Sequence, residues 1–385
     1  MSRKSHKSHK SHNSRKKSRD LRWFTIHSWI GLKLSILMSF VLFTGTMAVL
    51  SSEIDWLLNP PMRAATPVHA TAWGEALTAL RAEYPEAKIL SVSRRADAWW
   101  AIEALVESPW GELGRLWFDP ATGEYQGYTS WLNVQRFFRT VHRHLMLPTK
   151  IGIPIVTALA VPLLVSLIAG LVVYKGFWRG FFRWPRFERT TRIWAGDLHR
   201  LLGLWSSWFL VLIALTSVWY LVEVMGGRAP SLPSPTLPVG EWSEPSGEGL
   251  QAMVAEAERV HPDFQIRRIV FPNRDERPLL LMGELDAVLV RPRANAVAFA
   301  SATGELVGHY RGEELDLHTR ISEAADPLHF GYFGGLWTKA LWFLLGAAMT
   351  SLSITGCVIY GKRLAKRPRR PATQEAAMVI GKGAP

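Results

Sequence analysis

The stretch IGIPIVTALAVPLLVSLIAGLVVY, residues 151–174, contains no charged side chain. An α-helix rises about 1.5 Å per residue, so about 20 apolar residues are needed to cross a hydrocarbon layer about 30 Å thick. Three further stretches, at 34–50, 201–222 and 340–361, are also free of charge. The sequence therefore predicts an α-helical membrane protein with four transmembrane helices. These helices are predicted at residues 23–50, 133–176, 194–224 and 327–361.

The basic residues show how these helices are oriented. Residues 1–22, 175–192 and 362–385 together hold 22 of the 45 Lys and Arg residues, but three of the 32 Asp and Glu residues. Basic segments beside membrane helices stay in the cytoplasm. We therefore expect a bacterial inner-membrane protein with both termini in the cytoplasm, whose basic charge reflects topology and not a nucleic-acid partner. The predicted cytoplasmic segments are 1–22, 177–193 and 362–385, and the predicted periplasmic segments are 51–132 and 225–326.

The two predicted periplasmic segments resemble each other. Each contains an amphipathic helix that ends before a proline and is followed by a strand, as in ALTALRAEYPEAKI (76–89) and AMVAEAERVHPDFQI (252–266). Both also contain Ala-Thr-Gly-Glu between apolar or aromatic runs, which is typical of a hairpin turn. We therefore expect two small α+β domains, each with one helix packed on an antiparallel sheet, in a chain with pseudo-duplicated halves.

Histidine recurs near the cytoplasmic ends of two predicted helices. IHSWIGL (26–32) and DLHRLLGLW (197–205) share the pattern His-x-x-x-Gly-Leu around His27 and His199. An ionisable side chain in a membrane helix is costly and therefore needs a partner or a function. Both helices run outward from the cytoplasm, so these two histidines are predicted to lie at the same depth.

A second set of histidines lies near the periplasmic ends of the other two helices. His142 and His144 stand in VHRHLMLP (141–148), and His329 precedes the fourth helix in the motif PLHFGYFGG. Residues two positions apart point in different directions on a helix. We favour His142, because VHRHL matches LHRLL around His199, and we keep His144 as the alternative.

Two imidazoles at one depth of a helical bundle are typical axial ligands of a b-type haem. The predicted pairs are His27 with His199 on the cytoplasmic side, and His142 with His329 on the periplasmic side. The sequence therefore predicts two b-type haems, whose iron is held by these four histidines, and no catalytic residues beyond them. Zinc or copper without a porphyrin is the alternative, although two histidines alone under-fill a zinc site.

Two further features favour a porphyrin. Gly31 and Gly203 stand four residues after His27 and His199, on the same helix face, and leave space for a flat macrocycle. Basic side chains near the histidines are candidates to pair with the propionates, because charge-assisted hydrogen bonds suit arginine. These candidates are Arg139, Arg143, Arg200 and Lys33.

With the motifs DLHRLLGLW, VHRHLMLP and DPLHFGYFGGLWTKALWFLLG, the chain resembles the PepSY-associated transmembrane proteins over roughly residues 20–365. Within them it is most similar to the inner-membrane ferric-siderophore reductases of the ferrioxamine type. The resemblance implies PepSY-like periplasmic domains, b haems on the four histidines, and reduction of siderophore-bound Fe(III). The first motif departs from the pattern because IHSWIGL lacks an arginine after the histidine.

Together these observations favour a reductase that carries electrons from a cytoplasmic donor to a ferric siderophore in the periplasm and releases Fe(II). The sequence has no G-x-G-x-x-G before a helix and no P-loop, so we expect a separate donor: a reductase, a flavin or a quinol. Two alternatives remain open. One is a metal- or proton-linked transporter with histidines along its path, and the other is a membrane-anchored PepSY module that binds or regulates without a cofactor.

Overall fold

The computed structural model describes residues 21–174, 176–233, 235, 237, 243–272 and 277–365. The predicted basic tails fall almost entirely outside the described residues. The described chain forms two compact units. The first unit comprises residues 21–40, 162–208 and 348–365, and the second comprises the described residues of 41–161 and 209–347.

Four helical stretches of the described chain are long and apolar enough to cross a membrane, as the sequence predicts. They are Ser35–Leu58, Thr149–Val173, Ser207–Gly227 and Gly335–Arg363. The elements that form them are α2 (Ser35–Leu58), α5 (Thr149–Ala158) with α6 (Ala160–Val173), α8 (Ser207–Val222) with the π-turn η3 (Glu223–Gly227), and α11 (Gly335–Ala365). The break between α5 and α6 follows from Pro162, which has no N–H to donate to the carbonyl of Ala158.

A shorter helix precedes each span, and each of these helices carries one of the four histidines. The shorter helices are residues 21–33, α4 (Val134–His144), α7 (Thr191–Trp205) and α10 (Leu317–Phe330). The helix predicted over 133–176 is therefore divided, because Leu145 and Met146 take positive φ angles of 56° and 60° before Pro148. Gly331, with φ of 70°, ends α10 in the same left-handed conformation.

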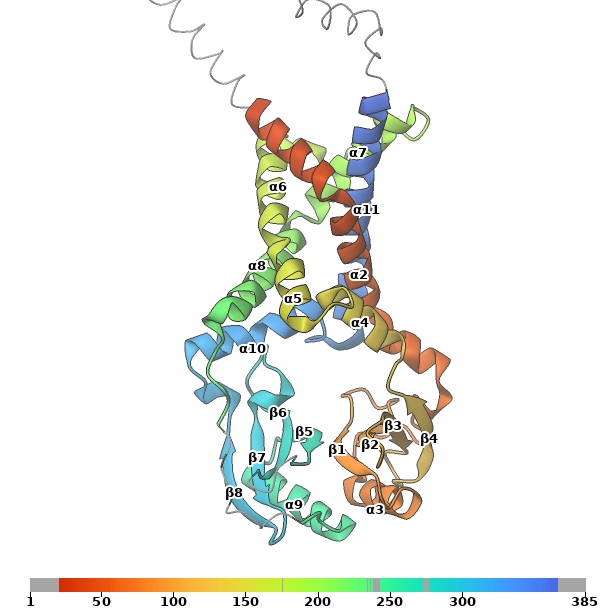
Figure 1. Cartoon of the computed structure of the whole chain (residues 1–385), viewed down its shortest axis with the longest axis vertical. Helices are drawn as coiled ribbons and strands as arrows, with labels where there is room; N and C mark the ends of the chain where they lie inside the picture. The colour runs from red at the N-terminus through yellow and green to blue at the C-terminus, as the bar shows by residue number, and fades with distance from the viewer. Residues whose placement is uncertain are drawn as a thin grey trace, which may run out of the picture. The chain divides into compact units, whose positions relative to one another are not determined.

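Eight antiparallel strands form one sheet in the second unit, in the order β4-β3-β2-β1-β5-β6-β7-β8 (Figure 1). The strands are β1 (Lys88–Ser93), β2 (Ile102–Glu107), β3 (Leu113–Phe118), β4 (Tyr125–Ser130), β5 (Gln265–Val270), β6 (Leu279–Glu284), β7 (Ala296–Ala300) and β8 (Glu305–Tyr310). The sequence predicts two separate α+β domains. The structure joins their strands into one sheet, because β1 pairs with β5 around Val92 and Ile269.

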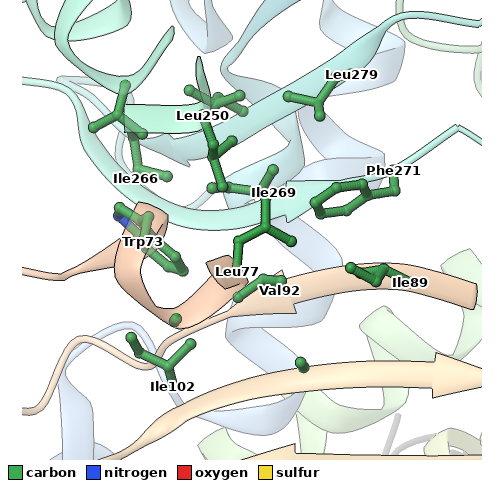
Figure 2. Close-up of a cluster of buried hydrophobic side chains, with 14 of the residues drawn as sticks. Trp73, Leu77, Ile89, Val92, Ile102, Leu250, Ile266, Ile269, Phe271 and Leu279 are labelled. Atoms are coloured by element: carbon green, nitrogen blue, oxygen red, sulfur yellow. The ribbon is translucent and has the colours of Figure 1, made fainter. Parts of the chain in front are cut away.

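Two helices and the sheet enclose one hydrophobic core, shown in Figure 2. Each half contributes one helix, α3 (Trp73–Glu83) or α9 (Gly247–Val260). The two helices pack closely because a side chain at Gly74 would lie 2.4 Å from the carbonyl oxygen of Gly247. Leu77 and Ile269 are almost fully buried in this core. Short 3₁₀ turns complete the fold at η1 (Pro60–Met62), η2 (Phe177–Gly180), η4 (Pro292–Ala294) and η5 (Gly312–Glu314).

Candidate functional site

The structure brings the four predicted histidines together two by two. In the first unit the ring centroids of His27 and His199 lie 6.1 Å apart, with 73° between the ring planes. In the second unit the ring centroids of His142 and His329 lie 6.2 Å apart, with 36° between the planes. Each pair therefore combines one histidine from each half of the chain.

These separations fit two imidazoles on opposite sides of one metal ion. A histidine nitrogen lies about 2.0 Å from a bound metal and its ring centroid about 1.1 Å further on, so two such rings have centroids about 6 Å apart. Among the described residues, no group of three or more His, Cys, Asp or Glu side chains gathers into a metal site. Two imidazoles at this separation fit a cofactor that takes two protein ligands and supplies the remaining ones itself, as a porphyrin does.

Three of the four histidines use Nδ1 to donate a hydrogen bond to the backbone of a neighbouring helix. The acceptors are the carbonyl oxygens of Ser166 for His27 (2.9 Å), Val41 for His142 (3.0 Å) and Leu352 for His199 (2.9 Å). A carbonyl can only accept, so Nδ1 carries the proton and Nε2 keeps its lone pair. Metal-ligating histidines are oriented in this way, by a hydrogen bond from the nitrogen that does not bind the metal.

Nδ1 of His329 also donates a hydrogen bond, but its acceptor is a side chain and not a backbone carbonyl. Its Nδ1 lies 2.9 Å from the hydroxyl of Thr216. That hydroxyl donates to the carbonyls of Leu212 and Ile213, both at 3.0 Å, so it accepts from His329. Within the described chain, none of the four Nε2 atoms makes a hydrogen bond to another residue. All four histidines can therefore present Nε2 to a metal ion.

Glycines on the neighbouring helices make room for three of these rings. A side chain at Gly45 would lie 2.6 Å from Cε1 of His142, and the corresponding distances are 3.4 Å for Gly170 with His27 and for Gly356 with His199. Each glycine stands four residues after the carbonyl that accepts from the histidine, as in VLFTG, SLIAG and LSITG. On a helix these positions share one face. The result is a notch that holds the imidazole at a fixed angle.

Gly31 and Gly203, which the sequence indicated as space for the macrocycle, do not lie against a histidine ring. A side chain at Gly31 would meet open space, and one at Gly203 would lie 3.3 Å from the side chain of Leu352. Sequence inspection of the histidine helices missed the notch glycines, because they belong to the partner helices. A small residue four positions after another in an apolar helix is a packing signal, but it does not say which side chain will fill the space.

The structure also separates His142 from its alternative. His144 lies at the end of α4, where its Nδ1 bonds within the following turn to the carbonyl of Leu147 at 2.6 Å. His142, in contrast, packs against α2 and pairs with His329. The geometry therefore favours His142 as the member of this pair.

The basic residues considered as propionate partners have distinct environments. Arg139 lies over the ring of Phe330 with its guanidinium carbon 5.7 Å from the ring centroid, and that ring contacts His329. Arg200 pairs with Asp197, a buried carboxylate that also receives a 2.8 Å hydrogen bond from Nε of Arg186. Lys33 and Arg143 are exposed. Arg139 is the candidate with a ring contact beside one of the four histidines.

An ion-pair network borders the His142/His329 pair and was not anticipated from the sequence. The ring of Tyr220 contacts His329, and its hydroxyl donates to Asp326 at 2.6 Å. Arg291 bonds both Asp326 (3.1 Å) and Glu323 (2.8 Å), and Glu323 is 1% exposed. Burial alone would lower the pKa of Arg291, but its hydrogen bonds to these carboxylates outweigh burial and raise it. Arg291 therefore keeps its positive charge beside the His142/His329 pair.

A basic cavity of about 340 Å³ lies beside the His199 helix in the first unit. It is lined in part by Arg186, Arg192, Asp197 and Arg200. Asp197 is paired with two of these arginines, which leaves Arg192 as the cation without a carboxylate partner among the described residues. The cavity suits a negatively charged group.

The fold and the site together define a polytopic membrane protein with an α+β portion and two histidine pairs on its helices. The family model for the PepSY-associated TM region matches residues 24–363. The chain therefore belongs to the PepSY-associated transmembrane family. No curated protein matches the chain.

Proposed function

We propose that this protein is an inner-membrane oxidoreductase that carries electrons from a cytoplasmic donor to a ferric siderophore in the periplasm. The observation that carries the proposal is the pairing of four histidines at centroid separations of 6.1 and 6.2 Å, each with Nδ1 in a hydrogen bond and Nε2 free to bind iron. His27 with His199, and His142 with His329, would each hold one b-type haem. When bound, such a haem supplies iron that alternates between the ferric and ferrous states.

The protein's own residues have defined tasks in this proposal. The carbonyl acceptors and notch glycines orient the imidazoles, so that little reorganisation accompanies a change of charge at the site. The basic cavity at Arg186, Arg192 and Arg200 is a place for the separate donor, which would carry a carboxylate or phosphate. We assign the first unit's histidine pair to the cytoplasmic side from the basic segments of the sequence.

The substrate follows from coordination chemistry and from the likeness to siderophore reductases. Siderophores hold Fe(III) through oxygen donors, which bind hard, highly charged cations best. Reduction to Fe(II) weakens that binding and releases the metal. The eight-stranded sheet, to which both halves of the chain contribute strands and which we place in the periplasm, would hold the chelate or a partner protein near the His142/His329 pair.

An absorption spectrum of the purified full-length chain tests the proposal. We expect a Soret band, sharp α bands after dithionite reduction, and two haems per chain in a pyridine haemochrome assay. His199→Ala is expected to lose one haem and His144→Ala to keep both, since His144 bonds within its own turn. A colourless preparation would overturn the proposal and leave the transporter and binding-module alternatives.

The substrate requires a second experiment. The dithionite-reduced protein, freed of excess reductant under anaerobic conditions, is mixed with a panel of ferric siderophores, and Fe(II) is trapped by a ferrous-specific dye. Oxidation of the protein together with Fe(II) formation supports the reductase. Haem that stays reduced with every chelate would show that siderophore-bound iron is not the acceptor.

A further inference from the structure

The two histidine pairs differ in the number of oxygen atoms that face Nδ1. Nδ1 of His27 lies 2.9 Å from the carbonyl of Ser166 and 3.0 Å from its hydroxyl. Nδ1 of His199 lies 2.9 Å from the carbonyl of Leu352 and 3.1 Å from the hydroxyl of Thr355. The first pair therefore has two oxygen atoms at each imidazole.

The second pair has one oxygen atom at each imidazole among the described residues. His142 faces the carbonyl of Val41 at 3.0 Å, and His329 faces the hydroxyl of Thr216 at 2.9 Å. The neighbouring Thr44 donates its hydroxyl hydrogen to the same carbonyl of Val41 at 3.1 Å. Four oxygen atoms thus surround the first pair's Nδ1 atoms, and two surround the second pair's.

The hydroxyls act as acceptors toward histidine. Thr355 donates to the carbonyl of Ser351 at 2.8 Å, so its lone pairs remain for His199. Thr216 donates to Leu212 in the same way. Nδ1 of His27 already carries a proton for the carbonyl of Ser166, so the hydroxyl of that residue can only accept from it.

Oxygen acceptors at Nδ1–H increase the electron density of the imidazole and raise its basicity as a ligand. A more basic ligand, with negative dipole ends aimed at it, stabilises the more highly charged ferric iron and so lowers the reduction potential. We propose that the second acceptor at each imidazole gives the His27/His199 site a lower reduction potential than the His142/His329 site. This inference rests on the proposed function and adds to it a preferred direction of electron transfer.

Nearby charges do not remove the difference. Beside the first pair, Arg200 would raise the potential, but it forms an ion pair with Asp197. Beside the second pair, Asp326 would lower the potential, but it is paired with Arg291. Asp197 also pairs with Arg186, which leaves one positive charge on this group, but the side chains of Arg186 and Arg200 are 58% and 47% exposed, so solvent and salt screen it. At the second site the opposite charges of Asp326 and Arg291 lie within hydrogen-bond distance and largely offset each other. The hydrogen bonds to Nδ1 then remain as the main difference between the sites.

The proposed difference in reduction potential favours electron transfer in one direction, toward the periplasm. Electrons move spontaneously from a centre of lower potential to one of higher potential. With the first pair on the cytoplasmic side, as the basic segments predict, transfer toward the periplasm is favourable without any conformational change. Ser166 and Thr355 would be positioning residues for this property, because they act through the histidines and do not bind iron.

A spectroelectrochemical titration of the purified haem-loaded protein tests the inference. Two midpoint potentials are expected, and they are assigned with His27→Ala and His142→Ala, each of which leaves one haem to be titrated. Ser166→Ala and Thr355→Val remove one acceptor each and are expected to raise only the lower potential. The backbone carbonyls stay in place in these variants, so haem content is expected to remain unchanged.

Matched controls separate electronic from structural effects. Thr355→Ser keeps the hydroxyl and is expected to keep the low potential. Thr157→Val, whose hydroxyl bonds to Ile153 and Pro154 on its own helix, is expected to shift neither potential. Equal potentials, a reversed order, or no shift in Ser166→Ala and Thr355→Val would overturn the inference while leaving the proposed function intact. A protein without haem would overturn the proposed function itself.

Discussion

Histidine rings meet in the helical part of the molecule and also in the sheet, but in different ways. On the helices, the centroids of each pair lie 6.1 or 6.2 Å apart and each Nδ1 bonds to another helix. In the sheet portion, His261 and His309 lie 5.0 Å apart and bond each other directly, Nε2 to Nδ1, at 3.3 Å. Two histidines that could hold a metal ion between them need separation and independent hydrogen bonds, whereas a direct hydrogen bond between the rings leaves no space for the ion.

The largest expected effect is on haem content, when one histidine is removed from a helix pair or from the pair in the sheet portion. Under the proposed function, His142→Ala is expected to lose one of the two proposed haems, because one of the two histidines that would hold it is removed. His309→Ala is expected to keep both, because its partner is another side chain of the sheet portion. The pyridine haemochrome assay measures haem content, and loss of haem in His309→Ala would contradict this difference between the two kinds of pair.

We expect destabilisation of the sheet core to leave the histidine pairs on the helices unaffected. Ile269→Ala truncates a fully buried side chain where β5 pairs with β1. It should lower the unfolding free energy by about 2–5 kcal/mol. Urea unfolding followed by circular dichroism measures the change, and Val288→Ala, at a 72% exposed position, serves as the control. We expect haem content in the absence of urea to be unchanged in both variants.

Haem retention is expected to depend on the space that the notch glycines leave for the histidine rings. Gly45→Ala would place Cβ 2.6 Å from Cε1 of His142, so the ring must shift. Changes of this kind beside a ligand typically weaken metal binding about 10- to 100-fold. Haem retention during competition with apomyoglobin measures the effect. Gly31→Ala meets open space and should behave like the wild type.

A substitution in the basic cavity tests whether the electron donor binds there. Arg192→Glu is expected to slow reduction by an anionic flavin about three- to tenfold at low salt, because it reverses a steering charge. Reduction by excess dithionite serves as the control for haem accessibility and should reach the same extent in both proteins. Unchanged flavin kinetics would place the donor elsewhere.

The stability of the sheet portion should depend weakly on pH through the His261/His309 pair. Burial lowers the pKa of His261, and the neighbouring His309 lowers it further. The unfolded chain therefore binds more protons than the folded one at mildly acidic pH, so stability falls as pH decreases below about 6.5. His261→Gln should remove this part of the pH dependence of sheet unfolding, measured between pH 5 and 8. A pH profile identical to that of the wild type would contradict the assignment.

Sequence periodicity predicted the helices and strands better than their connections. The four apolar spans follow from charge-free runs, and the turns between β3 and β4 and between β7 and β8 follow from the Ala-Thr-Gly-Glu signal. The bends after His142 and His329 were not predicted, because they depend on left-handed residues such as Leu145, which has no intrinsic preference for that conformation. The β1–β5 pairing joins residues about 180 positions apart, and no local pattern encodes it.

The sequence alone shows four stretches apolar and long enough to span a membrane and a histidine pattern that recurs in its two halves, and by the charge rule it predicts that the basic segments share one side. These features are local, because hydropathy, charge and spacing act over one helix length. The tertiary structure alone decided that His142 and not His144 meets His329, that Gly45 and Thr216 hold those rings, and that one pair has more hydrogen-bond acceptors than the other. Those features depend on which helices pack together, and backbone carbonyls on a partner helix leave no mark in the histidine's own neighbourhood of the sequence.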